Sequence, residues 1–287
     1  MIDKANNRNA DVSNFIEKIA VAIDICGSGS LIVHSNVMKA MKAIKLTTNA
    51  YELLNNHIEA LEYCASSRSL WIPTFNYQFP KTKFYDVESS KSEVGQLSEF
   101  ARLYWADWRT QVPIYSFCGK GEKPQVDEGS AIHPFGRNSV FSEIVKNDGV
   151  VLHYGTTINT TTIVHHVEEM LDNGPLYRYQ KMFSGVVKKN DCSDKKVVIK
   201  NFVRPLNKYL EYDWEKIQGD LIKENILHKV NEGASFAYVF SARKMFEYLT
   251  HQMMLDQCYL IDDKSKSWLK PMINHLGRRI EQADFEK

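Results

Sequence analysis

The segment from Val150 to Glu169 constrains the fold of this chain most, because its hydrophobic period changes partway along it. It begins with the apolar residues 150–152, passes through a turn-like stretch after Gly155, and continues with apolar residues at helical spacing. The apolar run predicts a buried strand, and the later spacing predicts a helix. We therefore interpret the segment as a strand, a loop and a helix.

Strand and helix patterns alternate along most of the chain. Strands are predicted at residues 31–33, 70–72 and 150–154, and helices at 95–105, 141–145, 212–222 and 241–255. Two more helices are marked by Val12, Phe15, Ile16, Ile19 and Ala20 after a cap at Asp11, and by Tyr51, Leu54, Ile58 and Leu61. This alternation predicts an α/β sheet covered by helices.

A basic hairpin is predicted near residues 176–206. Residues 177–187 and 195–203 have strand character and are joined by the polar residues 188–194. Residues 178–208 contain two acidic residues, Asp191 and Asp194, and nine basic residues, a local excess of seven positive charges in a chain of net charge +1. The basic residues are Arg178, Lys181, Lys188, Lys189, Lys195, Lys196, Lys200, Arg204 and Lys208. Such a patch attracts phosphates. The alternative is a solvated hairpin whose edge lysines prevent strand pairing between molecules.

The predicted helix after residue 160 carries a candidate general base. If Thr160, Thr161 or Thr162 caps it, then Thr162, His165 and Glu168 share one face. A neighbouring carboxylate can orient a histidine, whose unperturbed pKa of about 6.5 suits a general base. The alternative is a polar helix face in water.

A second histidine, His34, follows the predicted strand at residues 31–33. In open α/β sheets, ligands bind outside the carboxyl ends of the strands. We therefore expect His34 and His165 to line one crevice.

Several ordered segments carry a family resemblance. They are Val33-His34-Ser35, Trp71-Ile72-Pro73-Thr74-Phe75-Asn76-Tyr77, Phe84-Tyr85-Asp86, Ser90-Lys91-Ser92-Glu93-Val94-Gly95 with Glu99-Phe100-Ala101-Arg102, Arg109-Thr110-Gln111-Val112-Pro113 with Ser116, His133-Pro134-Phe135-Gly136-Arg137, and Thr162-x-x-His165-x-x-Glu168. Together they resemble the aminoglycoside 3-N-acetyltransferase family, whose fold differs from that of the common GNAT acyltransferases. Val112 and Lys91 replace a His and a Pro of the family pattern, so details of the ligand-facing surfaces need not carry over.

The resemblance implies a mixed central sheet flanked by helices and an acyl-coenzyme A dependent N-acyltransferase that needs no metal. His165 is then the catalytic base, oriented by Glu168 or Asp86. The residues implied for binding the cofactor or the oxyanion are His34, Ser35, Thr74 and Ser116. Tyr77, Arg109 and Arg204 are assigned to the substrate, with Arg137 as another phosphate-binding candidate.

Composition agrees with an enzyme of this kind. At 287 residues with 44% hydrophobic side chains, the chain can form one domain spanning residues 1–287, with the hairpin as an insertion. No apolar run approaches the roughly 20 residues of a membrane helix, and the N-terminus lacks the apolar core of a secretory signal. Five cysteines without a C-x-x-C pair suggest reduced thiols, so we expect a cytoplasmic protein.

Charge is the guide to the acceptor. An enzyme that captures polycationic aminoglycosides should have an acidic cleft, whereas this chain is balanced overall and basic in its hairpin. The favoured substrate is therefore a nucleotide-linked (dTDP- or UDP-) amino sugar for surface lipopolysaccharide synthesis. Aminoglycoside 3-N-acetylation, which confers antibiotic resistance, is the alternative.

Two readings of other classes remain open. A metal-dependent hydrolase would use His165, Glu168 and either His34 or His133 as ligands. A nucleic-acid binder would use the hairpin lysines, although the sequence pI of about 7.6 is low for such a protein. The expected partners are thus small molecules, without nucleic acid or membrane, and a homo-oligomer remains open.

Overall fold

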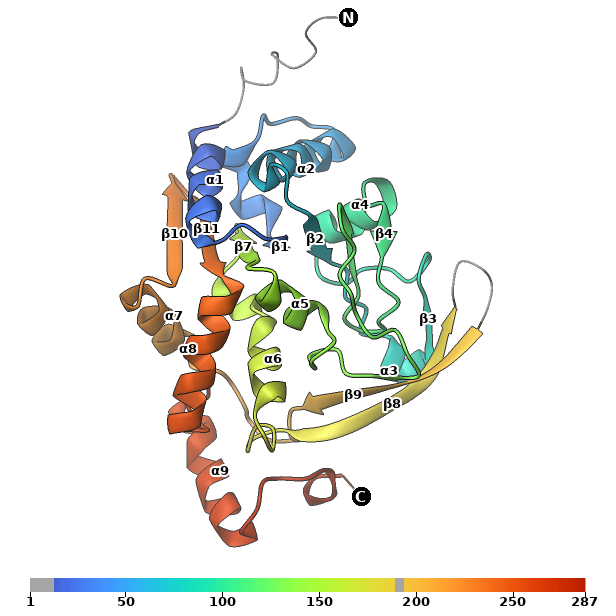
Figure 1. Cartoon of the computed structure of the whole chain (residues 1–287), viewed down its shortest axis with the longest axis vertical. Helices are drawn as coiled ribbons and strands as arrows, with labels where there is room; N and C mark the ends of the chain where they lie inside the picture. Colours follow the sequence, from blue (N-terminus) through green and yellow to red (C-terminus); the bar gives the residue numbers. More distant parts are fainter. Residues whose placement is uncertain (1–12, 189–193, 287) are drawn as a thin grey trace, which may run out of the picture.

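The computed structural model describes residues 13–188 and 194–286 (Figure 1). Within these residues, the strands form a seven-stranded sheet and a four-stranded sheet. The seven strands lie in the order β10 (Leu227–Glu232), β11 (Ser235–Ser241), β7 (Val150–Tyr154), β1 (Leu31–Ser35), β2 (Leu70–Pro73), β5 (Phe117–Lys120) and β4 (Trp108–Arg109). Because β1 runs parallel to β2 and β7 while the outer pairs are antiparallel, the expected mixed sheet is confirmed.

Helices cover both faces of the larger sheet. They are α1 (Asn14–Cys26), α2 (Ala50–Ala65), α4 (Gln96–Tyr104), α5 (Val140–Lys146), α6 (Ile163–Met170), α7 (Trp214–Lys223), α8 (Ala242–Leu255) and α9 (Asp263–Leu276). A further short helix, α3 (Phe79–Thr82), packs against the smaller sheet. Short 3-10 turns occur at Val37–Lys39, Met41–Ala43, Ile158–Thr160 and Gln282–Asp284. The helices predicted from apolar spacing are all present.

Alternate side chains of the central strands belong to two hydrophobic cores, one on each face of the larger sheet. Leu31 and Val33 of β1 pack with α1, α2 and α4, whereas Ile32 packs with the helices α5 to α9 on the opposite face. The same alternation divides Val151 from its neighbours in β7. Successive side chains of a strand point to opposite faces, so an uninterrupted apolar run is what a sheet covered on both sides requires.

The smaller sheet contains the predicted hairpin. Strands β8 (Tyr179–Lys188) and β9 (Asp194–Val203) are antiparallel, and β3 (Phe84–Asp86) and β6 (Ala131–Ile132) flank them. Figure 1 shows this long ribbon reaching past the end of α6. The turn expected at residues 188–194 lies mostly outside the described residues, since 189–193 are not among them.

The start of α1 corrects one expectation. Ser13, and not Asp11, is the N-cap, and its hydroxyl accepts a hydrogen bond from the Ile16 amide. Asp11 and Val12 lie outside the described residues. Both Ser and Asp are good N-cap residues, so spacing alone did not distinguish them.

The loop that leaves β7 is shaped by Gly155. Its φ of +68° lies in the left-handed region, and a Cβ atom there would lie 2.3 Å from the Asn36 carbonyl oxygen. Only glycine adopts this turn at no steric cost. The close approach brings the loop after β7 beside the loop after β1, so residues from both meet at one edge of the sheet.

A helix needs about 20 predominantly apolar residues to span a bilayer. Among the described residues, no helix is long and apolar enough to cross a membrane.

Truncation of a buried leucine in a central strand tests whether the assigned core stabilises the fold. Leu152 of β7 is completely buried, whereas Leu255 at the end of α8 is 72% exposed. We expect Leu152→Ala to lower the free energy of unfolding by about 2–5 kcal/mol, because it leaves a cavity between strand and helices. Leu255→Ala is the matched control and should change little. Urea unfolding measures both, and equal losses would contradict the assigned core.

Candidate active site

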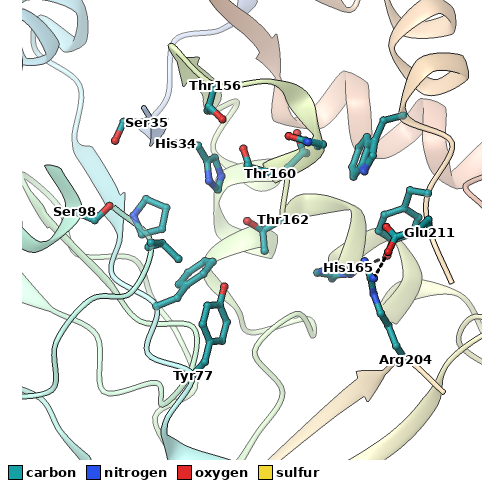
Figure 2. Close-up of a pocket in the computed structure, with 17 residues that line it drawn as sticks. His34, Ser35, Tyr77, Ser98, Thr156, Thr160, Thr162, His165, Arg204 and Glu211 are labelled. Atoms are coloured by element: carbon teal, nitrogen blue, oxygen red, sulfur yellow. Dashed lines mark hydrogen bonds and ion pairs between the residues drawn. The ribbon is translucent and has the colours of Figure 1, made fainter. Parts of the chain in front are cut away.

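A cavity of about 500 Å³, called the central cavity below, opens at the carboxyl ends of β1 and β7 (Figure 2). His34 and Ser35 line it from the end of β1, and residues of the 156–162 segment line it together with His165. Tyr77 follows β2, and the segment between β9 and α7 closes the remaining side. The structure thus brings His34 and His165 to one crevice, as the positions of the strands predicted.

His165 and Glu168 are joined one turn apart on α6. The Nδ1 atom of His165 lies 2.9 Å from Oε2 of Glu168, whose side chain is only 1% exposed. The i, i+3 spacing seen in the sequence therefore gives a direct contact.

Two further side chains complete the surroundings of Glu168. Its Oε1 atom accepts hydrogen bonds from the Tyr212 hydroxyl at 2.6 Å and from Nε of Arg178 at 3.2 Å. An Nη2 group of Arg178 also donates to the Tyr212 oxygen at 2.8 Å. Glu168 is therefore a buried carboxylate with several charge-assisted bonds.

These contacts determine the tautomer of His165. Tyr212 has one hydroxyl proton, and it is used on Glu168. The Tyr212 oxygen also lies 3.2 Å from Nδ1 of His165, so both neighbours of Nδ1 act as acceptors toward it. Nδ1 consequently carries the proton, and Nε2 is the basic atom.

The electrostatics favour a neutral base. Burial, partly opposed by the hydrogen bond and charge of Glu168, lowers the pKa of His165 below its usual value. Burial alone would raise the pKa of Glu168, but the charge of Arg178 and the bonds from His165 and Tyr212 lower it to about 2. An ionised Glu168 beside a neutral imidazole is the arrangement that a general base requires.

Two stacked histidines, His34 and His153, support the wall opposite His165. The rings of His34 and His153 stack with centroids 4.9 Å apart. His153 is completely buried, and its two ring nitrogens bond to the hydroxyls of Thr160 and Thr161 at 3.1 and 2.8 Å. Burial lowers the pKa of His34 to about 4, so His34 presents a neutral ring to the cavity.

Thr162 occupies the N-cap position of α6, as expected, but its side chain does not cap the helix. Its backbone is already helical, and the hydroxyl is buried without a protein hydrogen-bond partner among the described residues. Thr162 also lines the central cavity, one turn before His165 (Figure 2). A buried hydroxyl without a partner is energetically costly, and in proteins an ordered water or a ligand commonly completes such a group.

Asp86 is not brought to His165. Its carboxylate accepts hydrogen bonds from the amides of Glu88 and Ser89 and pairs with Lys188 at 3.3 Å. Of the two carboxylates proposed to orient His165, only Glu168 contacts it. Asp86 instead shapes the turn after β3, which is the usual role of an Asp at a turn.

Thr74, Ser116 and Arg109 form a buried cluster outside the lining of the cavity. Thr74 and Ser116 are completely buried, and their hydroxyl oxygens lie 3.0 Å apart. Arg109 donates to both hydroxyls and to the carbonyls of Thr74, Val87 and Ser90. These contacts hold the loop after β3 against β2, so the expected direct contacts of these residues with cofactor or substrate are not supported.

Tyr77 and Arg204 do line the cavity. Tyr77 is about half exposed, and Nη1 of Arg204 lies 2.7 Å from Oε1 of Glu211, which also lines the cavity. Figure 2 shows the Arg204–Glu211 pair beside His165. Arg137 lies instead in a second cavity of about 290 Å³.

Carboxylates from other segments of the chain neutralise part of the charge of the basic hairpin. Four of its basic residues form ion pairs, at distances of 2.5 to 3.3 Å: Arg178 with Glu168, Lys181 with Glu286, Lys188 with Asp86, and Arg204 with Glu211. Lys195 donates to the Glu128 carbonyl. The expectation of a phosphate-attracting patch is therefore weakened, because the local excess of charge counted only acids within the hairpin.

The hypothesis of a metal-dependent hydrolase requires a set of metal ligands, which the described residues do not provide. Across residues 13–188 and 194–286, no three His, Cys, Asp or Glu side chains are arranged to hold a metal ion. His133, offered as a ligand, bonds instead to Glu169 at 3.1 Å in the second cavity.

The sequence did not reveal the roles of Tyr212, Arg178 and His153. Arg178 was counted only as a hairpin charge, and Tyr212 lies 44 positions from its partner Glu168. His153 is hidden within an apolar strand pattern. A histidine inside such an apolar run is the one signal that could have identified His153.

Comparison with known proteins adds to this geometry. The sequence model described as aminoglycoside 3-N-acetyltransferase matches residues 50–254. None of the curated protein sequences shows a significant match.

Solved structures of similar fold include AAC-IIIb with CoASH, which has a TM-score of 0.65, 16% identity, and coverage of 83% of this chain and 95% of that one. A mutant of aminoglycoside acetyltransferase AAC(3)-IVa in complex with apramycin gives a TM-score of 0.64, 16% identity, and coverage of 88% and 96%. The YokD protein from Bacillus subtilis has a TM-score of 0.66 and 14% identity, and the match covers 85% of this chain and 94% of that one.

These likenesses confirm the expected α/β fold class. The family match covers well over half of the chain and includes most of the motifs that carried the resemblance. The chain therefore belongs to the aminoglycoside 3-N-acetyltransferase family, and it is an N-acyltransferase.

Proposed function

We propose that this enzyme transfers an acyl group from acyl-coenzyme A to the amine of an amino sugar, with His165 as general base. The observation that carries the proposal is the His165–Glu168 pair in the wall of the central cavity, with Nε2 of His165 as the basic atom. No metal takes part in the proposed reaction. The solved relative AAC-IIIb bound to CoASH supports coenzyme A as the thiol carrier.

The proposed chemistry needs one proton acceptor. The neutral amine attacks the thioester carbonyl carbon, and Nε2 of His165 accepts the proton that the nitrogen loses. Glu168 stabilises the imidazolium that forms, since it already accepts from Nδ1. As the carbon–sulfur bond breaks, the proton returns to the leaving thiolate, so coenzyme A departs as a thiol.

The tetrahedral oxyanion needs hydrogen-bond donors. Among the residues assigned to this role from the sequence, Ser35 lines the cavity, whereas Thr74 and Ser116 do not. Thr162 is a further candidate because its buried hydroxyl lacks a partner among the described residues and lies one turn from His165. We propose that Thr162 donates a hydrogen bond to the oxyanion and that Ser35 hydrogen-bonds to the adjoining part of the cofactor.

The two ends of the cavity differ in chemistry. His34, Ser35 and Thr156 give one end neutral polar groups suited to the amides of pantetheine. Tyr77 and the Arg204–Glu211 pair give the other end an aromatic ring and a balanced charge pair, which suit a sugar. We therefore propose that acyl-coenzyme A enters past β1 and that the acceptor lies toward Tyr77 and Arg204.

The distribution of these residues along the chain also supports a single functional unit. The cavity wall includes His34 near the start and Trp214 in the C-terminal third. We propose that residues 1–287 act as one acyltransferase domain, with the β8–β9 hairpin as an insertion.

An aminoglycoside is the favoured acceptor. Family membership and the complexes of AAC(3)-IVa with apramycin and with a gentamicin support it. The sequence had favoured a nucleotide-linked amino sugar because of the basic hairpin, but four of its nine basic residues are paired with carboxylates within the protein.

One observation keeps the nucleotide-linked amino sugar as the second candidate. The acidic residue that lines the cavity, Glu211, is paired with Arg204. A polycation would therefore meet few uncompensated carboxylates there.

Replacement of the base tests the mechanism. We expect His165→Ala to lower kcat by about 100-fold to 10,000-fold, because proton removal from the attacking amine loses its acceptor. Binding of coenzyme A, measured by calorimetry, should change little. The control is His251→Ala, an exposed residue of α8. Full activity in His165→Ala would refute the assignment of the base.

Substitution of the two serines assigned to cofactor binding, Ser35 and Ser116, should have different effects. Ser35 lines the cavity, whereas Ser116 is completely buried in the Arg109 cluster. We expect Ser35→Ala to raise the KM for acetyl-coenzyme A about 2-fold to 10-fold through one lost hydrogen bond. Ser116→Ala should instead lower the free energy of unfolding by about 1–3 kcal/mol and leave KM nearly unchanged. The reverse pattern would place the cofactor against the buried cluster.

A panel of acceptors tests the proposed substrate. Release of free thiol from acetyl-coenzyme A is measured with apramycin and gentamicin, and in parallel with nucleotide-linked 3- and 4-amino sugars. We expect turnover with the aminoglycosides, and the His165→Ala enzyme provides the background rate. Turnover with the nucleotide sugars alone would instead establish the second candidate.

A further inference from the structure

Glu168 and Arg178 form an ion pair that is withdrawn from solvent. Their side chains are 1% and 6% exposed, and they come from α6 and from the residue before β8. Tyr212 bridges the pair, since its hydroxyl donates to Glu168 and accepts from Arg178. Glu168 and Tyr212 both contact Nδ1 of His165, and Tyr212 also lines the central cavity.

We propose that Arg178 and Tyr212 are positioning residues of this site: they hold Glu168 as an ionised carboxylate and thereby keep Nε2 of His165 as the unprotonated atom. The inference rests on the proposed function, in which His165 is the base. It assigns roles to two residues that need not contact either substrate.

The argument begins with the cost of a buried carboxylate. A carboxylate without a partner in this environment would bind a proton, because burial disfavours the charged form. Arg178 supplies the opposing charge, and Tyr212 supplies a short hydrogen bond of 2.6 Å. With Glu168 ionised, both of its oxygens can act only as acceptors, which fixes the proton of His165 on Nδ1.

Arg178 also acts on the His165–Glu168 pair as a whole. Any positive charge nearby opposes the binding of one more proton by the pair, whichever residue carries that proton. Removal of the charge must therefore raise the pH at which the pair takes up its proton. The working base would then be lost at a higher pH than in the wild-type enzyme.

Other ionisable groups surround the pair, but their partners or positions differ. Arg204 approaches His165 from the segment before α7, yet it is about half exposed and neutralised by Glu211. Tyr177 is buried beside Glu168 and stays protonated, because burial raises the pKa of its hydroxyl. On the other flank of α6, Glu169 bonds to His133. Arg178 is therefore the cation in direct contact with Glu168.

The decisive experiment is a comparison of Arg178→Gln with the wild type. We expect the acid limb of the kcat/KM profile and the NMR titration of His165 to move upward by about one pH unit or more. The acceptor amine contributes the same ionisation to both profiles, so the difference reports on the enzyme. Arg178→Lys keeps the charge and should return both values to near those of the wild type.

A second variant guards against misfolding of Arg178→Gln. Tyr212→Phe retains the ring and the Arg178–Glu168 ion pair but removes one hydrogen bond to the carboxylate. We expect a smaller upward shift in the same two measurements. If neither substitution moves the His165 titration, Arg178 and Tyr212 only stabilise the fold and the proposal is overturned.

Arg102 provides the matched control. Its side chain is also largely withdrawn from solvent, at 7% exposed, and its Nη2 atom lies 2.7 Å from Oε1 of Glu99. Both residues belong to α4 and do not line the central cavity. Arg102→Gln should lower stability without moving the titration of His165. The NMR arm needs no turnover, so absence of acyltransferase activity would refute the proposed function while the titration still decides the roles of Arg178 and Tyr212.

Discussion

The ion pair between Glu168 and Arg178 joins the parts of the molecule on which the site depends. Glu168 belongs to α6, which packs against the larger sheet, whereas Arg178 directly precedes β8 of the smaller sheet. Tyr212 connects both to the segment before α7, where a bridge to Ile261 fixes its backbone. A buried ion pair contributes less to stability than its Coulomb energy suggests, since both charges lose water. Its stronger effect is on geometry, because each charge accepts few other positions.

The position of the site follows from the topology of the sheet. Parallel strands β1 and β7 lie side by side, so the residues that follow them meet at one edge. His34 lies at the end of β1 itself, whereas Thr162 and His165 lie at the start of α6, beyond the loop that follows β7. Stacking on His153 fixes one wall, and the bond to Glu168 fixes the other. Contacts among buried side chains therefore position both of these walls of the cavity.

Sequence patterns predicted the elements and the local part of the site, and they failed where contacts span long distances in the chain. The apolar runs of β1 and β7 and the apolar spacing of α8 were sufficient to predict these elements, because the positions of apolar residues follow the buried faces. The His165–Glu168 contact was predictable because it depends on one helical turn. Tyr212 was not, because only tertiary packing brings it to Glu168. For Thr74 and Ser116, a motif gave the position on a strand end but not the direction of the side chain, which points into a buried cluster.

The charge of the hairpin illustrates a more general point about substrate inference. A sum over residues 178–208 counts every lysine and arginine, but it omits acids that fold against them from elsewhere. Asp86, Glu168 and Glu286 belong to three separate segments, and each neutralises one hairpin cation. The field that a substrate meets depends on charges that remain after such pairing, and in the cavity the Arg204–Glu211 pair leaves the wall nearly balanced. For the acceptor site proposed above, hydrogen bonds and ring contacts are therefore expected to contribute more to recognition than long-range attraction.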